Sequence, residues 1–406
     1  MTTTSDIPNF PFDKTPLDPP AEWAEFREKC PVAHVRMPSG DVVGVVTRYQ
    51  DVRDVLADAR FTRDLSGPGA ARLANTEDGG TFGRPSPPDV NISHGDGHRR
   101  WRRLLSGSFT MKKMEQWRPR IQAIADELID DMIASVSHAD LMAGFGLPLP
   151  VAVICRMLGA PASDQDKFAE WSRASLTLTR YTQAEVDRAR GEFAAYVSAL
   201  VEEKRANPGD DLITELTQIS DAEDGRLSHA ELVQTGMGLL LAGHETTSNM
   251  IGKMTGILLA GEREHYTAVV AEPELIPGTV EEVLRTDSNT GIGIPRFITE
   301  DIEVGGCPVG KGSTLMMLMA AANRDESRFA DPDAFDPRRA NVAQHLTFGA
   351  GPHFCVGQPL ARVELQVALG TMVRRLPELR LRDGADALPL REGVLAGGFE
   401  NVWVTW

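Results

Sequence analysis

The chain has 406 residues, of which 42% are hydrophobic and 25% are charged, an ordinary composition for a folded globular protein. Asp and Glu outnumber Lys and Arg by 58 to 42, and the resulting net charge of −16 disfavours a nucleic-acid binder. Its cysteines, Cys30, Cys155, Cys307 and Cys355, are far apart and form no zinc-type spacing. The first residues carry no secretory signal, and no apolar stretch is long enough to span a membrane. We therefore expect a cytoplasmic protein with reduced thiols.

Helical patterns dominate the chain, and β-type runs gather near its two ends. Two alternating apolar runs, VAHVRM and VVGVVT, predict a β-hairpin, and the Gly- and Pro-rich stretch 67–97 predicts a long functional loop. Helices are then expected over about 99–108, 118–136, 184–204 and 358–376, and from near Pro277 through VEEVLR. The Ser228-x-x-Glu231 capping box predicts the start of a further helix of about thirty residues. Further β-type runs fall in 296–318. The pattern predicts one mainly α fold with a minor β portion, in a single domain over residues 1–406.

A single cysteine lies in a glycine-rich loop just before the last long helix, in Phe348-Gly-Ala-Gly-Pro-His-Phe-Cys355-Val-Gly357. Loop amides and a helix N-terminus both favour a thiolate, and glycines let a flat cofactor approach the backbone. A lone cysteine is more often a small buried hydrophobe, which is the alternative. The pattern F-x-x-G-x-H-x-C-x-G resembles the haem-binding loop of the cytochrome P450 family. This resemblance implies haem b, with Cys355 as the axial ligand of the iron and Phe348, Gly349 and Gly357 beside the cofactor.

Polar residues interrupt the long apolar helix in Ala242-Gly-His-Glu245-Thr246-Thr. Buried polar groups and a mid-helix glycine are costly, so such a segment indicates a function or a kink. Ala242 and Thr246 share a helix face, and the small residues leave room there for a diatomic ligand. A threonine that bonds back to a carbonyl is the structural alternative. The segment is similar to the family's A-G-x-D/E-T-T motif, which implies that Thr246 hydrogen-bonds dioxygen and Glu245 relays protons.

Three charged residues resemble a structural cluster of the same family. Glu282 and Arg285 match E-x-x-R, and the stretch from Phe335 to Arg339 matches F-D-P-x-R. An i, i+3 pair of this kind is usually a solvated ion pair on a helix surface. The resemblance implies instead that Glu282, Arg285 and Arg339 fold inward and fix the segment behind the haem.

The two haem propionates need cationic or hydrogen-bonding partners, and the resemblance supplies four candidates. His98 and Arg102 match H-x-x-x-R, Arg296 matches R-x-x-x-E-D, and His353 lies two residues before the cysteine. Each of them alone would more often be a solvated surface charge. The residues before His98 depart from the usual D-P-P-E, which leaves His94 as a competitor.

The resemblance assigns the substrate pocket to several segments, including the loop 67–92 and the stretch 172–182. Because 288–294 is polar and rich in glycine, we expect a roomy pocket for a sizeable, partly polar metabolite. The predicted pocket residues are Met237, Gly238, Leu241, Asn289, Gly291, Ile292 and Phe399.

Over the whole chain, the resemblance implies a monooxygenase that inserts one oxygen atom from O2 into an organic small molecule. Electrons would come from NAD(P)H through a separate ferredoxin and ferredoxin reductase, since the chain leaves no length for a flavin or nicotinamide domain. Oxidative coupling, ring closure or desaturation by the same haem, and a haem sensor without turnover, are the alternatives. We expect a monomer without nucleic-acid or membrane partners. Cations that would attract an acidic ferredoxin, or merely aid solubility, are Lys112, Lys113, Arg118, Arg120, Arg362, Arg374 and Arg375.

Overall fold

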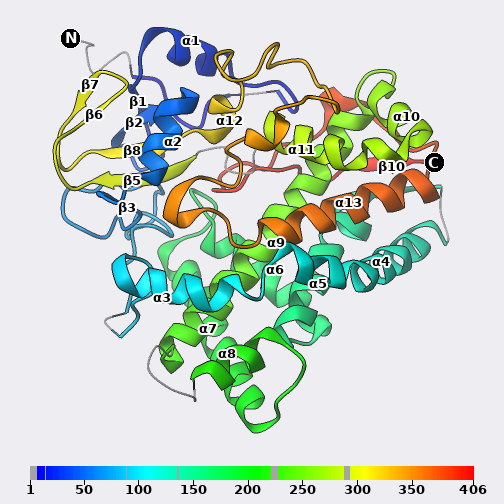
Figure 1. Ribbon diagram of the computed structural model, residues 1–406, viewed down its shortest axis with the longest axis horizontal. Helices are drawn as coiled ribbons and strands as arrows, with labels where there is room; N and C mark the ends of the chain where they lie inside the picture. The colour runs from blue at the N-terminus through cyan, green and yellow to red at the C-terminus, as the bar shows by residue number, and fades with distance from the viewer. Residues whose placement is uncertain (1–6, 14, 88, 135–136, 221–226, 288–292) are drawn as a thin grey trace.

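The computed structural model describes residues 7–13, 15–87, 89–134, 137–220, 227–287 and 293–406. Strands β1, β2, β8, β5 and β3 lie together on one side of the molecule, and most of the helices lie on the other (Figure 1). The prediction of a mainly α fold with a minor β portion is confirmed. Among the described residues, no helix combines the length and the apolar character that a membrane crossing requires.

The helices lie at the following positions. The α-helices are α1 Ala21–Lys29, α2 Tyr49–Ala57, α3 Gly95–Ser106, α4 Met111–Ile133, α5 Pro148–Leu158, α6 Gln165–Ser175, α7 Gln183–Ala206, α8 Leu212–Ser220, α9 His229–Leu259, α10 Glu264–Ala271, α11 Ile276–Thr286, α12 Met319–Ala322 and α13 Gln358–Arg375. Shorter helical turns are η1 Met142–Gly146, η2 Ala162–Asp164, η3 Pro273–Leu275, η4 Val342–Gln344, η5 Gly351–His353 and η6 Ala385–Ala387.

Several helix starts follow from capping residues in the sequence. Both Thr182 and Ser228 form complete capping boxes, which open α7 and α9. The helix predicted over 118–136 corresponds to α4, and its predicted start was wrong. The Thr110 hydroxyl accepts a hydrogen bond from the Lys113 amide, so that α4 already begins at Met111. The expected loop 67–97 is likewise shorter, since α3 already begins at Gly95.

The strands form three sheets. They are β1 Ala33–Arg36, β2 Val42–Val46, β3 Phe61–Thr62, β4 His138–Asp140, β5 Ile294–Ile298, β6 Ile302–Val304, β7 Cys307–Val309, β8 Thr314–Met317, β9 Arg380–Leu381 and β10 Trp403–Thr405. The five-stranded sheet has the order β1-β2-β8-β5-β3, and β1 and β2 form the predicted hairpin. The strands cluster as expected near the two ends of the chain and around 296–318, except that β4 lies elsewhere in the sequence and pairs with β10. Three residues are too short for a periodic signal.

Helix α9 lies at the centre of the helical part, and α5, α7 and α13 pack against it. Two of its glycines serve this packing. A side chain at Gly243 would come within 2.9 Å of Ile154, and one at Gly236 would come within 2.6 Å of Val197. The free energy lost by placing Gly243 in mid-helix is therefore offset by the close approach of α5, and not by space for a ligand as the sequence had suggested.

Candidate functional site

The loop before α13 surrounds the Cys355 sulfur with donors. The Cys355 amide bonds to the Phe348 carbonyl at 2.9 Å, which closes the loop, and α13 begins three residues after the sulfur. Burial raises the pKa of the thiol, whereas the amides of Gly357 and Gln358 and the Arg102 guanidinium act in the opposite direction. Because these donors and the helix N-terminus all favour negative charge, the loop is built for a thiolate.

Two glycines of this loop border open space. A side chain at Gly349 or at Gly357 would meet no atom within 4 Å. By contrast, one at Gly351 would come within 2.4 Å of Ala57, so that glycine is needed by the packing against α2. The first pair leaves room for a flat group close to the backbone beside Cys355. Phe348 lies at the edge of the loop, with the Arg362 guanidinium 4.6 Å from its ring centre.

Helix α9 has one open face in a stretch that is otherwise largely buried. Gly238, Ala242 and Thr246 recur at four-residue spacing, and none of them is buried. A side chain at Gly238 would meet nothing within 4 Å. The Thr246 hydroxyl donates to the Ala242 carbonyl at 2.8 Å, so the back-bonding alternative is present in this structure. The same hydroxyl lies on the open face, where a bound molecule would meet it.

The acid next to this threonine is held by a residue that the sequence did not point to. Glu245 is buried and forms an ion pair with Arg391, and Arg391 lies 3.9 Å from Glu400. Glu400 in turn pairs with Arg180 near the surface. Nothing in the local sequence marks Arg391, because its partner lies 146 positions away and only the fold brings the two together.

The neighbouring His244 is also buried. Its Nδ1 lies 2.6 Å from the Leu240 carbonyl, which requires that this nitrogen carries the proton and donates. Its Nε2 has no hydrogen-bond partner among the described residues and lies 3.9 Å from the Glu245 carboxylate. Burial lowers the pKa of His244, so the ring is neutral at neutral pH.

The three residues of the predicted structural cluster meet in the interior. Arg285 and Glu282 are both 0% exposed and form two hydrogen bonds of 2.7 Å. Arg285 also donates to the carbonyls of Asn323 and Pro332, and Arg339 reaches Glu282 at 3.1 Å. Each charge of this cluster thus has partners from the chain itself.

The four predicted propionate partners converge on a second charge cluster. The rings of His98 and His353 lie 4.2 Å apart, and within the described part of the chain Arg296 donates to the Pro295 carbonyl alone. Burial and the nearby Arg63 lower the pKa of Arg296 to about 9. Burial and these neighbouring cations lower the pKa of His353 to about 3. Arg102 lies on α3, one turn after His98, and its charge acts on the Cys355 sulfur.

The competitor His94 lies at the edge of this cluster. It precedes α3, and its Nδ1 lies 3.2 Å from the Thr62 hydroxyl. His98, one turn later, is only 6% exposed, and its ring centre lies 4.2 Å from that of His353. The geometry therefore favours His98 over His94 as the residue that faces the space beside the Cys355 loop.

Only some of the predicted pocket residues lie on the open face of α9. Gly238 and Leu241 do, whereas Met237 is 7% exposed and packs in the core. Phe399 is 0% exposed and would contact side chains placed at Gly252 and Gly256, so its assignment to the pocket was wrong. Neighbouring residues of a helix face different directions, which the resemblance alone could not resolve for Met237. Asn289, Gly291 and Ile292 lie outside the described residues.

Gly293, which borders this segment, has a packing role. Its φ is +82°, and a side chain there would come within 2.4 Å of the Met317 carbonyl oxygen. A large residue at Gly293 would therefore distort the pairing of β5 with β8. Such a variant cannot report on pocket size.

Most of the basic residues expected on the cysteine side are neutralised by acids. Lys113 lies 3.5 Å from Glu215, and Arg362 lies 2.6 Å from Glu281. The remaining paired cations are Arg118 with Glu115, Arg120 with Asp210, Arg374 with Asp126 and Arg375 with Asp130. Lys112 is the single member of the set without an ion pair among the described residues. The set therefore forms a mixed surface and not a continuous basic patch.

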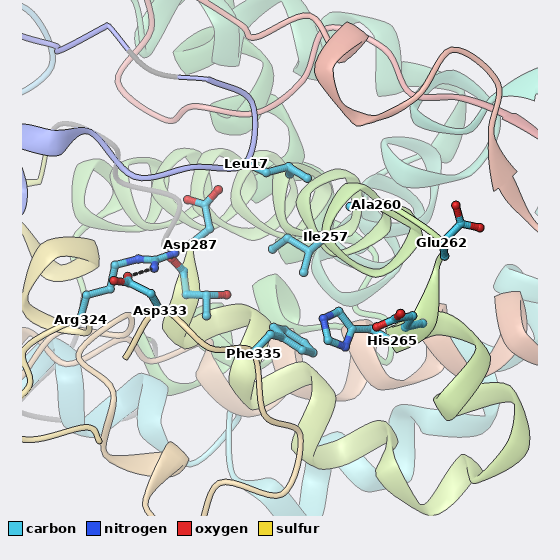
Figure 2. Close-up of a pocket in the computed structure, with 12 residues that line it drawn as sticks. Leu17, Ile257, Ala260, Glu262, His265, Asp287, Arg324, Asp333 and Phe335 are labelled. Atoms are coloured by element: carbon cyan, nitrogen blue, oxygen red, sulfur yellow. Dashed lines mark hydrogen bonds and ion pairs between the residues drawn. The ribbon is translucent and has the colours of Figure 1, made fainter. Parts of the chain in front are cut away.

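A separate surface cavity of about 400 Å³ lies between the end of α9, α10 and the loop around Asp333 (Figure 2). The Arg324–Asp333 ion pair lies at one side, and His265 and Phe335 face each other with ring centres 4.6 Å apart. None of the predicted site residues lines this cavity. It is therefore distinct from the space beside Cys355.

These features fit haem. The Cys355 loop supplies a sulfur surrounded by donors, two glycines border open space, and the buried cations nearby have no anionic partner in the described part of the chain. The family model described as Cytochrome P450 matches residues 172–378. This chain belongs to the cytochrome P450 family.

Relatives of this cytochrome P450 match it over the full length. Nocardicin C N-oxygenase of Nocardia uniformis subsp. tsuyamanensis is 38% identical, and mycinamicin IV hydroxylase/epoxidase of Micromonospora griseorubida is 39% identical, each over 100% of both chains. The crystal structure of the LnmA cytochrome P450 hydroxylase from the leinamycin pathway of Streptomyces atroolivaceus S-140 matches with a TM-score of 0.86 at 35% identity, covering 98% of this chain and 100% of that one. The chain is thus a haem-dependent monooxygenase that uses O2 and receives electrons from NAD(P)H through redox partners.

Proposed function

We propose that this cytochrome P450 oxygenates a sizeable, partly polar secondary metabolite by hydroxylation or epoxidation. The net reaction of a hydroxylation is R–H + O2 + 2 e⁻ + 2 H⁺ → R–OH + H2O. When bound, the haem with its thiolate ligand supplies the activation of dioxygen, since the thiolate favours cleavage of the O–O bond. The relatives' names, which include a nocardicin N-oxygenase and a mycinamicin hydroxylase, support a substrate of natural-product size.

The observation that carries the proposal is the open face of α9. Gly238, Ala242 and Thr246 leave a strip without large side chains along two turns of the central helix. At its end lies a hydroxyl beside a buried carboxylate. A strip of this length accommodates a large molecule, and the polar groups at one end can handle the protons that the reaction consumes.

In this proposal Thr246 and Glu245 handle protons. The Thr246 hydroxyl, which donates to the Ala242 carbonyl, would be available on the open face to donate to dioxygen and orient it. Glu245 takes part in the proton transfer, and Arg391 holds its carboxylate in place. Glu400 and Arg180 extend this chain of ion pairs toward the surface. Cys355 holds the iron, and His98, Arg102, Arg296 and His353 bind the propionates.

For the redox partner we propose a ferredoxin that docks on the side of Cys355, and that is itself reduced by a ferredoxin reductase. Phe354, next to the cysteine, is 36% exposed, Met111 is 46% exposed, and Lys112 lies beside Met111. Exposed apolar residues with a nearby cation are suited to a transient acidic partner. All four cysteines are free thiols, which supports a reducing, cytoplasmic setting, and we propose a monomer that forms one domain over residues 1–406.

Spectral titration of the purified haem protein tests the substrate class. A panel graded in size, from monoterpenes to glycosylated macrolides, is titrated while the shift of the Soret band is followed. We expect the larger, partly polar compounds to bind more tightly, and turnover with a surrogate ferredoxin and reductase to give a product heavier by one oxygen atom. Tight binding of small apolar terpenes together with silence of the large compounds would contradict the proposal.

A further inference from the structure

An arginine that belongs to none of the family motifs lies in the charge cluster of His98, Arg296 and His353. Arg63 follows strand β3, which pairs with β5 in antiparallel register through Phe61–Ile298 and Thr62–Phe297. Continuing this register by one residue places Arg63 opposite Arg296. Like charges directly opposite each other on neighbouring strands destabilise a sheet unless something lies between them.

Arg63 has no anionic partner among the residues that the structure describes. Its Nε is buried without a hydrogen-bond partner, and no ion pair joins it to any residue that the structure describes. Its guanidinium lies 5.6 Å from the ring centre of Phe82. The adjacent acid, Asp64, accepts the Ser66 amide instead. For comparison, Arg60 on the same strand edge pairs with Asp58 at 2.6 Å.

The groups around Arg63 are also basic. Its charge acts on Arg296, His98 and His353, and those groups come from three separate elements. Because a buried guanidinium without a counter-charge is strongly destabilising, a cluster of this composition requires an anionic ligand. His353 lies two residues before Cys355, so the anion must sit beside the space that the flat cofactor fills.

We propose that Arg63 is an additional anchor for a haem propionate, acting across the sheet from Arg296. A guanidinium suits this task, because its planar fork can bind a carboxylate through two parallel hydrogen bonds. The proposal concerns cofactor retention and is independent of the substrate proposed above.

Haem retention in the purified holoprotein provides the test. Wild type, Arg63→Gln, Arg63→Lys and Arg296→Gln are mixed with excess apomyoglobin, and haem transfer is followed spectroscopically. The matched control is Arg72→Gln, since Arg72 is exposed and pairs with Asp41 outside the cluster. Because a hydrogen bond to a charged group contributes roughly 1.5–3 kcal/mol, we expect Arg63→Gln to lose haem about ten- to a hundredfold faster. Arg63→Lys keeps the charge but not the bidentate geometry and should lose haem at a rate between wild type and Arg63→Gln, whereas Arg72→Gln should remain close to wild type.

A second measurement separates a propionate contact from a general effect on folding. The full-length apoprotein is reconstituted with iron protoporphyrin IX dimethyl ester, which has no propionate charge. The difference between wild type and Arg63→Gln should then disappear. If Arg63→Gln retained haem like wild type while Arg296→Gln lost it quickly, the proposal would be overturned. An equal defect with the ester would also overturn it, because the residue would then act on the fold. Unchanged retention with weaker binding of anionic substrates would assign Arg63 to the substrate instead.

Discussion

The molecule contains two buried charge clusters that differ in the source of the counter-charge. We call the first the closed cluster, because the chain itself neutralises it, and the second the open cluster, because a ligand must do so. In the cluster of Glu282, Arg285 and Arg339, the carboxylate is part of the chain and each guanidinium has a partner. In the cluster of Arg63, Arg296, His98 and His353, the described residues supply cations and imidazoles but no paired carboxylate. The first is therefore complete without a ligand and serves the architecture, whereas the second is complete only when an anion binds.

The largest effect should come from breaking the closed cluster. Replacing Glu282 by Ala leaves Arg285 buried with no carboxylate, and we expect the protein to lose about 3–5 kcal/mol of stability or to fail to accumulate. Denaturant unfolding of the holoprotein measures this. The matched control is Arg338→Ala, because Arg338 adjoins Arg339 but its pair with Glu272 is exposed and should contribute less than about 1 kcal/mol. Equal losses in both variants would refute the distinction.

The buried group of Glu281, His345 and Arg362 should account for part of the loss of folding stability at acidic pH. Burial alone would raise the pKa of Glu281, but hydrogen bonds from His345 and Arg362 outweigh it and lower the pKa from 4.5 to about 2. A depressed pKa gives stability that is present above pH 4.5 and is lost as the pH falls toward 2. The shift corresponds to about 3 kcal/mol. We expect Glu281→Gln to be less stable at neutral pH and to show a flatter dependence between pH 4.5 and 2.

Unfolding curves at a series of pH values test this expectation. Glu272→Gln is the control, since the Glu272 carboxylate is exposed in its pair with Arg338. If Glu281→Gln retained the full acid dependence of the wild type, another carboxylate would be responsible. The result would also show whether Arg362 is held by Glu281, as the structure has it, or is available to a redox partner.

In the open cluster, removing a charge should not destabilise the protein when haem is absent, in contrast to the closed cluster. In the apoprotein, Arg296→Gln removes one of several neighbouring cations, so the melting temperature should stay the same or rise slightly. In the holoprotein the same change should weaken haem retention by about 1.5–3 kcal/mol. Thermal melts with and without haem distinguish the two. A strong loss of apoprotein stability would mean that Arg296 is architectural like Arg285.

The sequence alone predicted those features of the fold and the site that depend on residues close together in the chain. The capping box at Ser228 and the cysteine loop gave the start of α9 and the position of Cys355, because both depend on residues that are close in the chain. Glu282 and Arg285 were recognisable only through a family resemblance, since an i, i+3 ion pair is ordinary on any helix surface.

The features that the sequence missed depend on tertiary contacts. Arg63 and Arg391 are single arginines in unremarkable surroundings, and they acquire meaning only when β3 meets β5 or when the C-terminal loop reaches α9. The same limit explains the wrong assignment of Phe399, which the fold turns into the core. A residue's distance along the chain from a motif does not determine which way its side chain points.

The smallest effect on stability, but a clear one on function, should come from Thr246→Ala. The variant loses the hydroxyl that donates to the Ala242 carbonyl on an open face, so unfolding should change by less than about 1.5 kcal/mol. If the hydroxyl orients the bound co-substrate, reduced nicotinamide will still be consumed while product falls several-fold and hydrogen peroxide appears. Thr246→Ser keeps the hydroxyl and should stay coupled. If Thr246→Ala remained tightly coupled, the hydroxyl would serve only the architecture through its bond with the Ala242 carbonyl, as the contacts of the Glu282 cluster do.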